Sequence, residues 1–485
     1  MCRYSIIEIV AVRRKKGEAI MKDIRKTMAA VSALTLVLSS VFSCSLSKKD
    51  ESSEESVTEA QTTEEVTEAE EEEEFRKADA DDKMAITWLS DYDINPAKGE
   101  KRSSALEIFE DVFGGKINYV YTPEESKYDR LAEMINAGEE VDMFPYEKGA
   151  FPEGVLRDLY APLDDYYEEL GMDTGIWDNM QEVIDMFEFR GSHYVIPYSL
   201  TRPTILTYSR NVMRENGFED PYELYKQGQW TWDKFMEMMK SFTANGGGYG
   251  INGEFGQAAL ASSGSTLIKK ENGQLVNNIS DSALGSAEQL LADIYANGLY
   301  RDNWIEHFDT DANVLFYAME DWALGESNAL NEDKDLMIVP FPKSPDADRY
   351  YISCEHNARL LAKNSQKGGA VATYIRCERL AETEPSFKDE RKAAATTVVK
   401  KGNGDVKSFI TDEQYDALQE FLDPSQCFPL FDFGYGMGKG MYDYNGAGVM
   451  YNMETTLLNG YYDSWDFARD AWTDLVQEQT ARYAQ

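Results

Sequence analysis

Four oxygen-bearing residues near residue 310 have the types and spacing of calcium ligands. They fall at positions 1, 3, 5 and 12 of an EF-hand-like loop and are Asp309, Asp311, Asn313 and Glu320. Position 6 of such a loop needs glycine for its sharp turn, and this chain has Val314 there. A helix that carries Val314, Leu315 and Met319 explains the segment better, so we expect no metal site.

Other residue types that support catalysis or metal binding occur without a recognisable pattern. The three histidines are far apart, and the five cysteines form no CxxC pair. GxSxG, HExxH and phosphate-cradling motifs are absent from the sequence. The segment Gly434–Gly440 lacks the Lys-Ser/Thr pair of a Walker loop, and we interpret it as a flexible loop. We therefore expect no catalytic residue, no metal and no cofactor.

Net charge excludes one class of partner. The formal charge is -39, with 87 acidic residues against 48 basic ones. Nucleic-acid binding needs clustered lysine and arginine, and adhesion to an anionic membrane needs the same. The sequence therefore predicts no nucleic-acid partner.

The beginning of the chain has the features of an export signal. Basic residues precede an apolar stretch, Met28–Phe42, which is of signal-peptide length and short for crossing a bilayer. The small residue Ser43 and then Cys44 follow, in an arrangement that resembles a bacterial lipobox. This resemblance implies cleavage before Cys44 and a lipid on its sulfur. We therefore assign residues 1–43 to a leader, in which residues 1–20 are an upstream extension before the true start codon.

The next segment, residues 44–82, has the composition of a disordered tether. It is rich in Ser, Thr and Glu and contains five consecutive glutamates, Glu70–Glu74. Such a segment buries too little apolar surface to offset its ordering entropy, and like charges keep it extended. If the chain is exported, a disulfide among Cys354, Cys377 and Cys427 is compatible with its environment, but the spacing does not assign one.

Alternating strands and helices follow the tether. Strands are predicted at 84–89, 116–121 and 141–144, with amphipathic helices between them that end at Gly114–Gly115 and Gly138. This order favours a mostly parallel sheet with crossover helices. Ligands bind beyond the carboxyl ends of the strands in such sheets. Residues at these ends are therefore candidates for a site: Asp91, Tyr92, Phe144 and Tyr146.

Several segments carry a resemblance to one family. They are Tyr128–Gly138 with Val141–Phe144, Leu159–Tyr166, Gly191–Tyr198, Tyr208–Phe218, Trp230–Phe235, Phe316–Trp322 and Met337–Lys343. In this order they resemble the family 1 extracellular solute-binding proteins, the maltose-binding-protein-like group. Where that family usually has Tyr-Asn, this chain has Tyr208-Ser209. The resemblance spans roughly residues 84–380.

The resemblance implies a periplasmic-binding-protein-like type II fold: α/β, with two lobes joined by crossover strands at a hinge. The N-terminal lobe would comprise residues 83–198 and 340–393. The C-terminal lobe would comprise residues 199–339 and 394–485. A ligand would be closed between the two lobes.

The resemblance also implies which side chains meet the ligand. Trp322 ends a segment that faces the cleft in the family, and Tyr198 lies at the implied hinge. Glu355 and His356, with Ser353, fall on an implied loop before a strand at Ala358–Ala362. Tyr435 lies in the glycine-rich loop, which we place at the mouth of the cleft. Trp230 and Trp232 flank Thr231, a helix N-cap by sequence, and we assign both to packing.

The implied function is that of a monomeric, lipid-anchored subunit of an ABC importer. It would capture a mono- or oligosaccharide and deliver it to membrane permease subunits, on the extracellular face of the cell membrane of a Gram-positive bacterium. Twelve per cent of the residues are aromatic, which suits stacking on sugar rings. The alternative hypothesis is a secreted carbohydrate-active enzyme, either a glycoside hydrolase or a lyase. A third hypothesis is a surface adhesion module.

Overall fold

The computed structural model describes residues 82–301, 305, 307–308, 313–443 and 448–483. The described residues belong to two compact units. One contains residues up to Ile86 together with Asn95–Asn118, and the other contains Thr87–Ile94 and the chain from Tyr119 onward. The leader, Cys44 and the acidic tether lie outside the described residues.

The first sheet has four strands in the order β15-β3-β1-β2. Their bounds are Ala85–Ser90 for β1, Lys116–Tyr121 for β2, Met143–Pro145 for β3 and Arg359–Leu361 for β15. β3 is parallel to β1, as the sequence predicts, and β15 is antiparallel to β3. Asp91 and Tyr146 directly follow β1 and β3, so they lie at the carboxyl ends of two parallel strands.

Helices α3 (Ser104–Phe113) and α4 (Lys127–Ala137) confirm the predicted helical segments. The side chain of Ser103 caps α3 by accepting a hydrogen bond from the backbone N–H of Leu106. Each helix ends at a glycine in the left-handed conformation, with φ of 66° at Gly114 and 68° at Gly138. Glycine adopts this conformation without a Cβ clash, which explains why both helices stop there.

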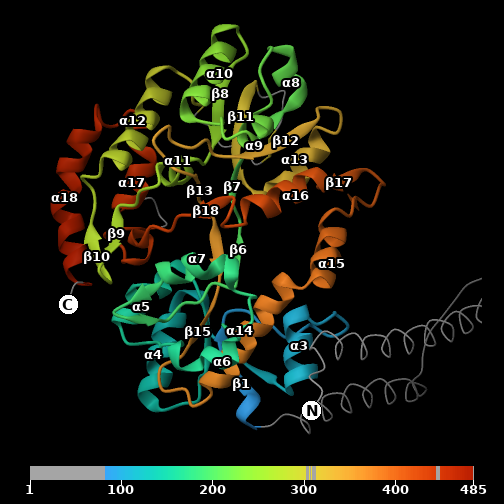
Figure 1. Cartoon of the computed structure of the whole chain (residues 1–485), viewed down its shortest axis with the longest axis vertical. Coiled ribbons are helices and arrows are strands. Elements are labelled where there is room, and N and C mark those ends of the chain that lie inside the picture. Colours follow the sequence, from blue (N-terminus) through green and yellow to red (C-terminus); the bar gives the residue numbers. More distant parts are fainter. Residues whose placement is uncertain (1–81, 302–304, 306, 309–312, 444–447, 484–485) are drawn as a thin grey trace, which may run out of the picture. The chain divides into compact units, whose positions relative to one another are not determined.

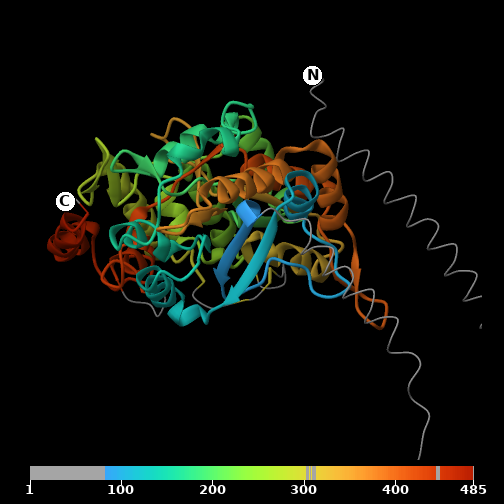
Figure 2. The same cartoon turned by 90° about the horizontal axis from the view of Figure 1, so that it is seen from below.

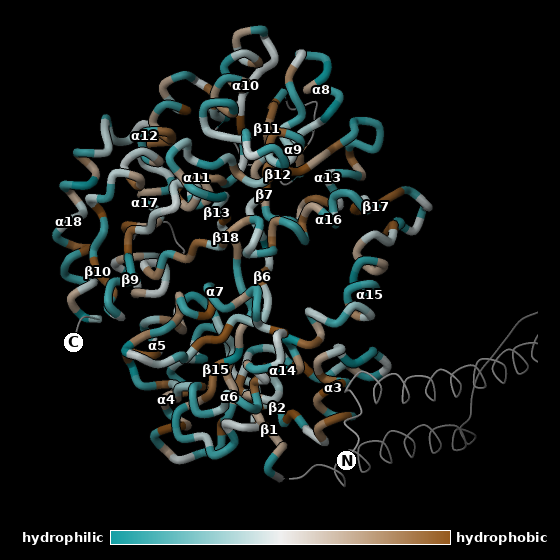
Figure 3. The backbone as a smooth tube through the Cα atoms, in the orientation of Figure 1, coloured by the Kyte–Doolittle hydropathy of each residue, from teal (hydrophilic) through white to brown (hydrophobic). Residues whose placement is uncertain are grey.

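The second sheet has four strands in the order β12-β7-β11-β8. Their bounds are Thr204–Ser209 for β7, Tyr249–Gly253 for β8, Val314–Glu320 for β11 and Leu336–Pro340 for β12. The helix predicted over Val314–Met319 is therefore wrong. β11 pairs on both sides, and its residues are buried up to Met319. A continuous apolar run matches helical and strand spacing equally well, and here the central place in the sheet decides the outcome. Figure 3 shows β11 and β12 in brown, at the hydrophobic end of its scale.

Helices pack around this sheet, and Figure 1 shows α8, α9 and α10 next to its strands. Trp230 and Trp232, at the start of α10 (Trp232–Ala244), are buried, which confirms their predicted packing role. Their indole N–H groups donate to Pro340 O and Ser262 Oγ, each at 2.9 Å. The other helices of this part are α8 (Arg210–Glu215), α9 (Pro221–Lys226), α11 (Gly256–Ala261), α12 (Ser282–Ala296), α13 (Leu324–Leu330), α16 (Asp412–Phe421), α17 (Val449–Thr455) and α18 (Trp465–Ala481).

A short ladder and a 3-10 helix correct the two predicted loops. β14 (Glu355–Asn357) pairs antiparallel with β6 (Ser199–Thr201), so Glu355 and His356 lie on a strand and not on a loop. β13 (Tyr350–Ile352) pairs parallel with β18 (Cys427–Pro429). The glycine-rich segment begins with a 3-10 helix, η8 (Phe433–Gly436), whose four residues are all buried, so this part is no flexible surface loop. Neither β14 nor η8 has enough residues to show a period in the sequence.

A helical connection joins β15 to α16. It consists of α14 (Gly368–Thr383), α15 (Pro385–Ala395) and a hairpin of β16 (Val399–Lys400) with β17 (Val406–Ser408). Figure 2 shows α14 from below as a long orange helix. The remaining short elements are α5 (Glu153–Leu156), α6 (Tyr167–Leu170), α7 (Gln181–Met186) and the hairpins β4 (Glu188–Phe189) with β5 (Ser192–His193) and β9 (Ile268–Glu271) with β10 (Gln274–Asn277).

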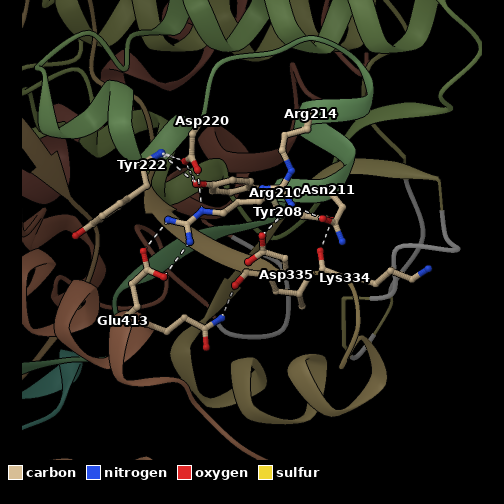
Figure 4. A network of polar contacts seen from close by, with 12 residues as sticks. Tyr208, Arg210, Asn211, Arg214, Asp220, Tyr222, Lys334, Asp335 and Glu413 are labelled. Carbon is tan, nitrogen blue, oxygen red and sulfur yellow. Dashed lines mark hydrogen bonds and ion pairs between the residues drawn. The ribbon is translucent and has the colours of Figure 1, made fainter.

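Ion pairs bring the C-terminal third of the chain onto the second sheet (Figure 4). The guanidinium of Arg210, at the start of α8, donates to Glu413 of α16 at 2.7 and 2.9 Å and to Asp220 at 2.7 Å. Tyr208, on β7, donates its hydroxyl to the same Asp220. Residues about 200 positions apart are thus held together by a bidentate pair, the strongest geometry for arginine and carboxylate.

Candidate ligand-binding site

A cavity of about 490 Å³ lies beyond the carboxyl end of β3. Its wall comes from five stretches of chain: the residues around α4, the segment after β3, the β6–β7 connection with β14, Gln257 of α11, and η8 with the residues before it. Aromatic rings dominate its apolar lining: Tyr128, Tyr146, Phe151, Phe431, Phe433 and Tyr435. A concave site of this size, lined by aromatic rings together with charged and polar side chains, can hold a small molecule.

His356 is a closely confined polar group of this cavity. Its ring centroid lies 4.1 Å from that of Tyr146, 4.6 Å from that of Phe187 and 4.8 Å from that of Phe431. The side chain is 8% exposed, and its Nε2 has no hydrogen-bond partner among the described residues. Burial lowers the pKa of His356 to about 3, so the imidazole is neutral at physiological pH. A buried nitrogen without a partner is costly, and a ligand hydroxyl in the cavity would satisfy it.

Two tyrosines place further neutral groups at the cavity. Tyr146 directly follows β3, and burial raises its pKa, with the negative charge of Glu355 adding to the effect. Tyr128, on α4, has a buried hydroxyl without a partner among the described residues, and burial raises its pKa also. Both phenols therefore stay protonated and present a donor and an acceptor each.

The charged groups of the cavity come from three places. Arg202, between β6 and β7, adopts a left-handed backbone with φ of 48° and lies 3.5 Å from Glu355. Lys127 of α4 is buried and is shared by Glu147 and by Asp91, which lies 3.2 Å away. Lys148 lies over two aromatic rings, 5.0 Å from the centroid of Tyr435 and 5.6 Å from that of Tyr442.

Two buried carboxyls, those of Asp432 and Glu454, hold η8 in place. Asp432 accepts hydrogen bonds from the backbone N–H groups of Leu267, Ile268 and Gly434. Tyr435 donates its hydroxyl to Glu454 of α17. These bonds hold the ring of Tyr435 toward the cavity, with its hydroxyl turned to α17.

Glu454 makes the stability of the protein depend on pH. Burial raises its pKa to about 7 from an ordinary value of 4.5, against the opposing effects of the Tyr435 hydroxyl and Lys148. Glu254 and Glu288 are the other charged groups that act on it. When folding raises the pKa of a carboxyl, the fold is stabilised at pH values below the pKa of the unfolded state. This stabilisation is lost as the pH rises through the pKa of the folded state.

We expect the urea midpoint of the full chain to decrease as the pH rises from about 5 to about 7.5. In this window Glu454 binds a proton in the folded state but not in the unfolded state. Glu454→Gln retains an acceptor for Tyr435 and should flatten this decline. Glu478→Gln, an exposed change on α18, is the matched control. Equal declines in wild type and Glu454→Gln would show that Glu454 does not titrate in this range.

Two of the ten candidate residues, Phe144 and Ser353, are buried and do not line the 490 Å³ cavity. The structure places the other eight in three groups. Tyr146, Glu355, His356 and Tyr435 line the 490 Å³ cavity. Asp91 does not line it, but shares Lys127 with the lining residue Glu147. The remaining three lie elsewhere: the hydroxyl of Tyr92 accepts a hydrogen bond from Arg359 at 3.0 Å, the buried ring of Tyr198 lies 5.6 Å from the same guanidinium, and Trp322 is 56% exposed beside His307.

Sequence reasoning missed several residues of the wall, including Tyr128, Lys148, Arg202 and Phe431. Lys148 follows Tyr146 by two positions, so the strand-end rule that selected Tyr146 could have included it. Arg202 lies four residues after the predicted hinge at Tyr198 and directly before a proline, which was a usable signal. Tyr128 and Phe431 carry no local signal, because only long-range packing brings them to the cavity.

A second cavity, of about 1170 Å³, is lined by α14, α15, α16 and the β6–β14 ladder. Its wall is a mixture of acidic and basic side chains with few aromatic rings. Arg379 of α14 is 5% exposed there and donates to Tyr198 O at 2.9 Å and Ile176 O at 2.8 Å. Its third bond goes to the amide oxygen of Asn179, so this guanidinium is held by uncharged oxygens.

Metal and disulfide chemistry find no support in the described part of the chain. No group of three or more His, Cys, Asp or Glu residues is arranged there to hold a metal ion, and Asp309 and Asp311 lie outside that part. Cys354, Cys377 and Cys427 are buried and free, so the described cysteines form no disulfide. Within the same ranges, every helix falls short of the length and apolarity that crossing a bilayer requires.

Comparison with known proteins gives one family and a shared fold. The family model described as bacterial extracellular solute-binding protein matches residues 104–373. No curated protein matches the sequence.

Three solved structures share the fold at low sequence identity. The sugar-binding protein MalE from Xanthomonas citri is 15% identical, with a TM-score of 0.59, over 82% of this chain and 98% of the other. A family 1 extracellular solute-binding protein from Bifidobacterium longum subsp. infantis is 14% identical, with a TM-score of 0.57 and the same coverage. The galacto-N-biose/lacto-N-biose I-binding protein of an ABC transporter from Bifidobacterium longum, solved with lacto-N-biose, is 13% identical, with a TM-score of 0.54, over 83% and 96%.

Proposed function

This chain belongs to the bacterial extracellular solute-binding proteins, and from that premise we propose that it captures a saccharide and hands it unchanged to the permease of an ABC importer. The predicted type II periplasmic-binding-protein-like α/β fold is confirmed by the likeness to the sugar-binding protein MalE and to a family 1 extracellular solute-binding protein. The ligand named for one of these neighbours is a disaccharide, lacto-N-biose, which supports the same class of cargo here.

One observation carries the proposal: an aromatic cavity contains a buried histidine whose Nε2 has no partner. Apolar ring faces stack on the C–H faces of a sugar, and neutral donors and acceptors match its hydroxyl groups. Tyr146 and Tyr435 supply ring faces, while His356 and Tyr128 supply neutral polar atoms. We propose these residues, together with Glu355 and Arg202, as ligand contacts. Contacts from Asp91, Tyr92, Tyr198 and Trp322 stay predictions.

We further propose capture by closure of the two predicted lobes. Residues 83–198 of the predicted N-terminal lobe meet residues 394–485 of the other lobe at the cavity, where Lys148 lies over Tyr435. Nearby, Glu153 of α5 accepts a bond from Arg482 at 3.1 Å. A ligand that touches both stretches binds the closed state better than the open one, and this difference drives closure.

Loss of the Tyr146 ring should weaken binding strongly. Tyr146→Ala removes a ring face and also the wall against which His356 is stacked, so we expect at least about 30-fold weaker saccharide binding. Titration calorimetry of the full chain measures the effect. Tyr121→Ala, an exposed tyrosine of β2 that does not line the cavity, is the matched control. Equal losses in the two variants would remove Tyr146 from the site.

We propose that Cys44 carries a lipid that holds the protein on the outer face of the membrane as a monomer. A tether of residues 44–82 would keep the body close to the permease and raise its effective concentration there. Expression of Cys44→Ala in a Gram-positive host should release the protein into the medium. Retention of this variant on the membrane would contradict lipid anchoring.

Incubation with saccharides separates capture from catalysis. The full chain should retain one equivalent of a mono- or oligosaccharide in equilibrium dialysis. Chromatography of the recovered sugar should show it unchanged. Appearance of cleaved products would instead establish a carbohydrate-active enzyme.

A further inference from the structure

Both cations that line the 490 Å³ cavity are already engaged. Lys148 lies over the rings of Tyr435 and Tyr442, and its charge also acts on Glu454. Arg202 lies 3.5 Å from Glu355. A carboxylate, phosphate or sulfate on a ligand would therefore have to share these two cations with the contacts that they already make.

Carboxylates, in contrast, are in excess around the same cavity. Glu124, Glu147 and Glu355 line it. Lys127 alone serves both Glu147 and Asp91. Arg202 faces Glu355 and, at longer range, Glu320 at the end of β11. The cavity wall thus has uncompensated negative charge on both sides.

Burial makes the negative charge of these carboxylates costly when no cation is beside them. Burial raises the pKa of Glu320, and the neighbouring carboxylate of Glu355 raises it further. The same cause raises the pKa of Glu147, even though Lys127 opposes it. Negative charge in such a place is stabilised by an incoming cation far more than it would be in water.

The unpartnered Nε2 of His356 supports a ligand site at this acidic wall. Its Nε2 is buried and has no hydrogen-bond partner among the described residues, and His356 lines the same cavity, where a polar ligand atom could bind Nε2. Because its imidazole is neutral, His356 does not offset the negative charge of the cavity wall. The aromatic rings beside it attract a cation through their faces, as Lys148 already demonstrates at Tyr435.

We propose that the cargo is an amino sugar, a saccharide whose protonated amine is held by Glu355 and the neighbouring carboxylates while its hydroxyl groups meet His356 and Tyr128. This inference rests on the proposed function and specifies its substrate class. The same wall discriminates against uronic acids and sugar phosphates, because their negative charge is repelled by Glu124, Glu147 and Glu355.

Titration calorimetry of the full chain tests the proposal with matched probes. The probes are glucose, glucosamine, N-acetylglucosamine and glucuronic acid, their β-1,4-linked dimers, and the galactose counterparts. We expect the free amine to bind at least about tenfold more tightly than its neutral or acetylated counterpart, a difference of one Coulombic contact near a protein surface. The preference should disappear as the pH rises through the pKa of the amine.

The outcomes separate the inference from the proposed function. Equal or tighter binding of a neutral, acetylated or acidic probe overturns the amino-sugar assignment and leaves saccharide capture standing. Binding of none of these saccharides overturns both.

Glu355→Gln tests the charge itself. It preserves the shape of the side chain and should reduce the ratio of amine to neutral affinity by about tenfold. Glu332→Gln removes one exposed carboxylate after α13, away from the cavity, and should leave the ratio unchanged. An unchanged ratio in Glu355→Gln would remove this carboxylate from recognition of the amine.

Discussion

Gly436→Ala should weaken saccharide binding by at least about 100-fold, an effect of the size seen at binding hot spots. A Cβ on Gly436 would lie 1.9 Å from the carbonyl oxygen of Phe151 and 2.5 Å from that of Lys148. Both obstacles are backbone atoms, which cannot rotate away as a side chain would. The extra methyl would therefore force η8 and the segment after β3 apart, and this would separate Tyr435 from Lys148 and widen the cavity.

Gly440→Ala is a matched control in the same glycine-rich segment. Its Cβ would meet only the side chain of Gln479, at an ordinary contact distance of 3.4 Å. Calorimetry should show near-normal affinity in this variant and the large loss in Gly436→Ala. If Gly436→Ala binds as wild type does, the close approach of these segments is not required for binding.

Arg379→Met should destabilise the fold by about 3 kcal/mol, because it leaves buried carbonyl oxygens without a donor. The side chain donates to the backbone oxygens of Tyr198 and Ile176 and to Asn179. Burial lowers the pKa of Arg379 to about 10, which still leaves the guanidinium charged at neutral pH. The cost of burial is therefore offset by hydrogen bonds that methionine cannot make.

Urea denaturation of the full chain measures this loss. Lys388→Met removes an exposed cation from α15 in the wall of the same 1170 Å³ cavity and should change stability little. Similar midpoints for wild type and Arg379→Met would show that solvent replaces the three lost bonds. That result would contradict a structural role for Arg379 in holding the start of β6.

The sequence predicted those parts of the fold that depend on local signals. The strands and helices between Ala85 and Pro145 follow from apolar runs, helical spacing and the glycines at 114 and 138. β11 was mispredicted as a helix because every residue of its run is apolar or nearly so, and only its place between β7 and β8 excludes a helix. The sequence predicts a loop at β14, since a strand of three residues has no measurable period.

Site residues with a local sequence signal could likewise be predicted, and those that depend on long-range packing could not. Tyr146 was selected because it follows a parallel strand, and the structure places it in the cavity wall. The strand-end rule also selected Tyr92, whose hydroxyl instead accepts a hydrogen bond from Arg359. The approach of η8 to the segment after β3 joins residues nearly 300 positions apart. No local pattern encodes such a contact, so Phe431, just before η8, can be assigned to the cavity only from the three-dimensional structure.

A thermal-shift screen of the full chain tests the central claim of saccharide capture most directly. A ligand that binds only the folded state raises the melting temperature by mass action. Capture predicts a concentration-dependent rise with one class of saccharide, and Tyr146→Ala should suppress this rise. An unchanged melting temperature with every saccharide, or a rise that survives Tyr146→Ala in full, would contradict the account.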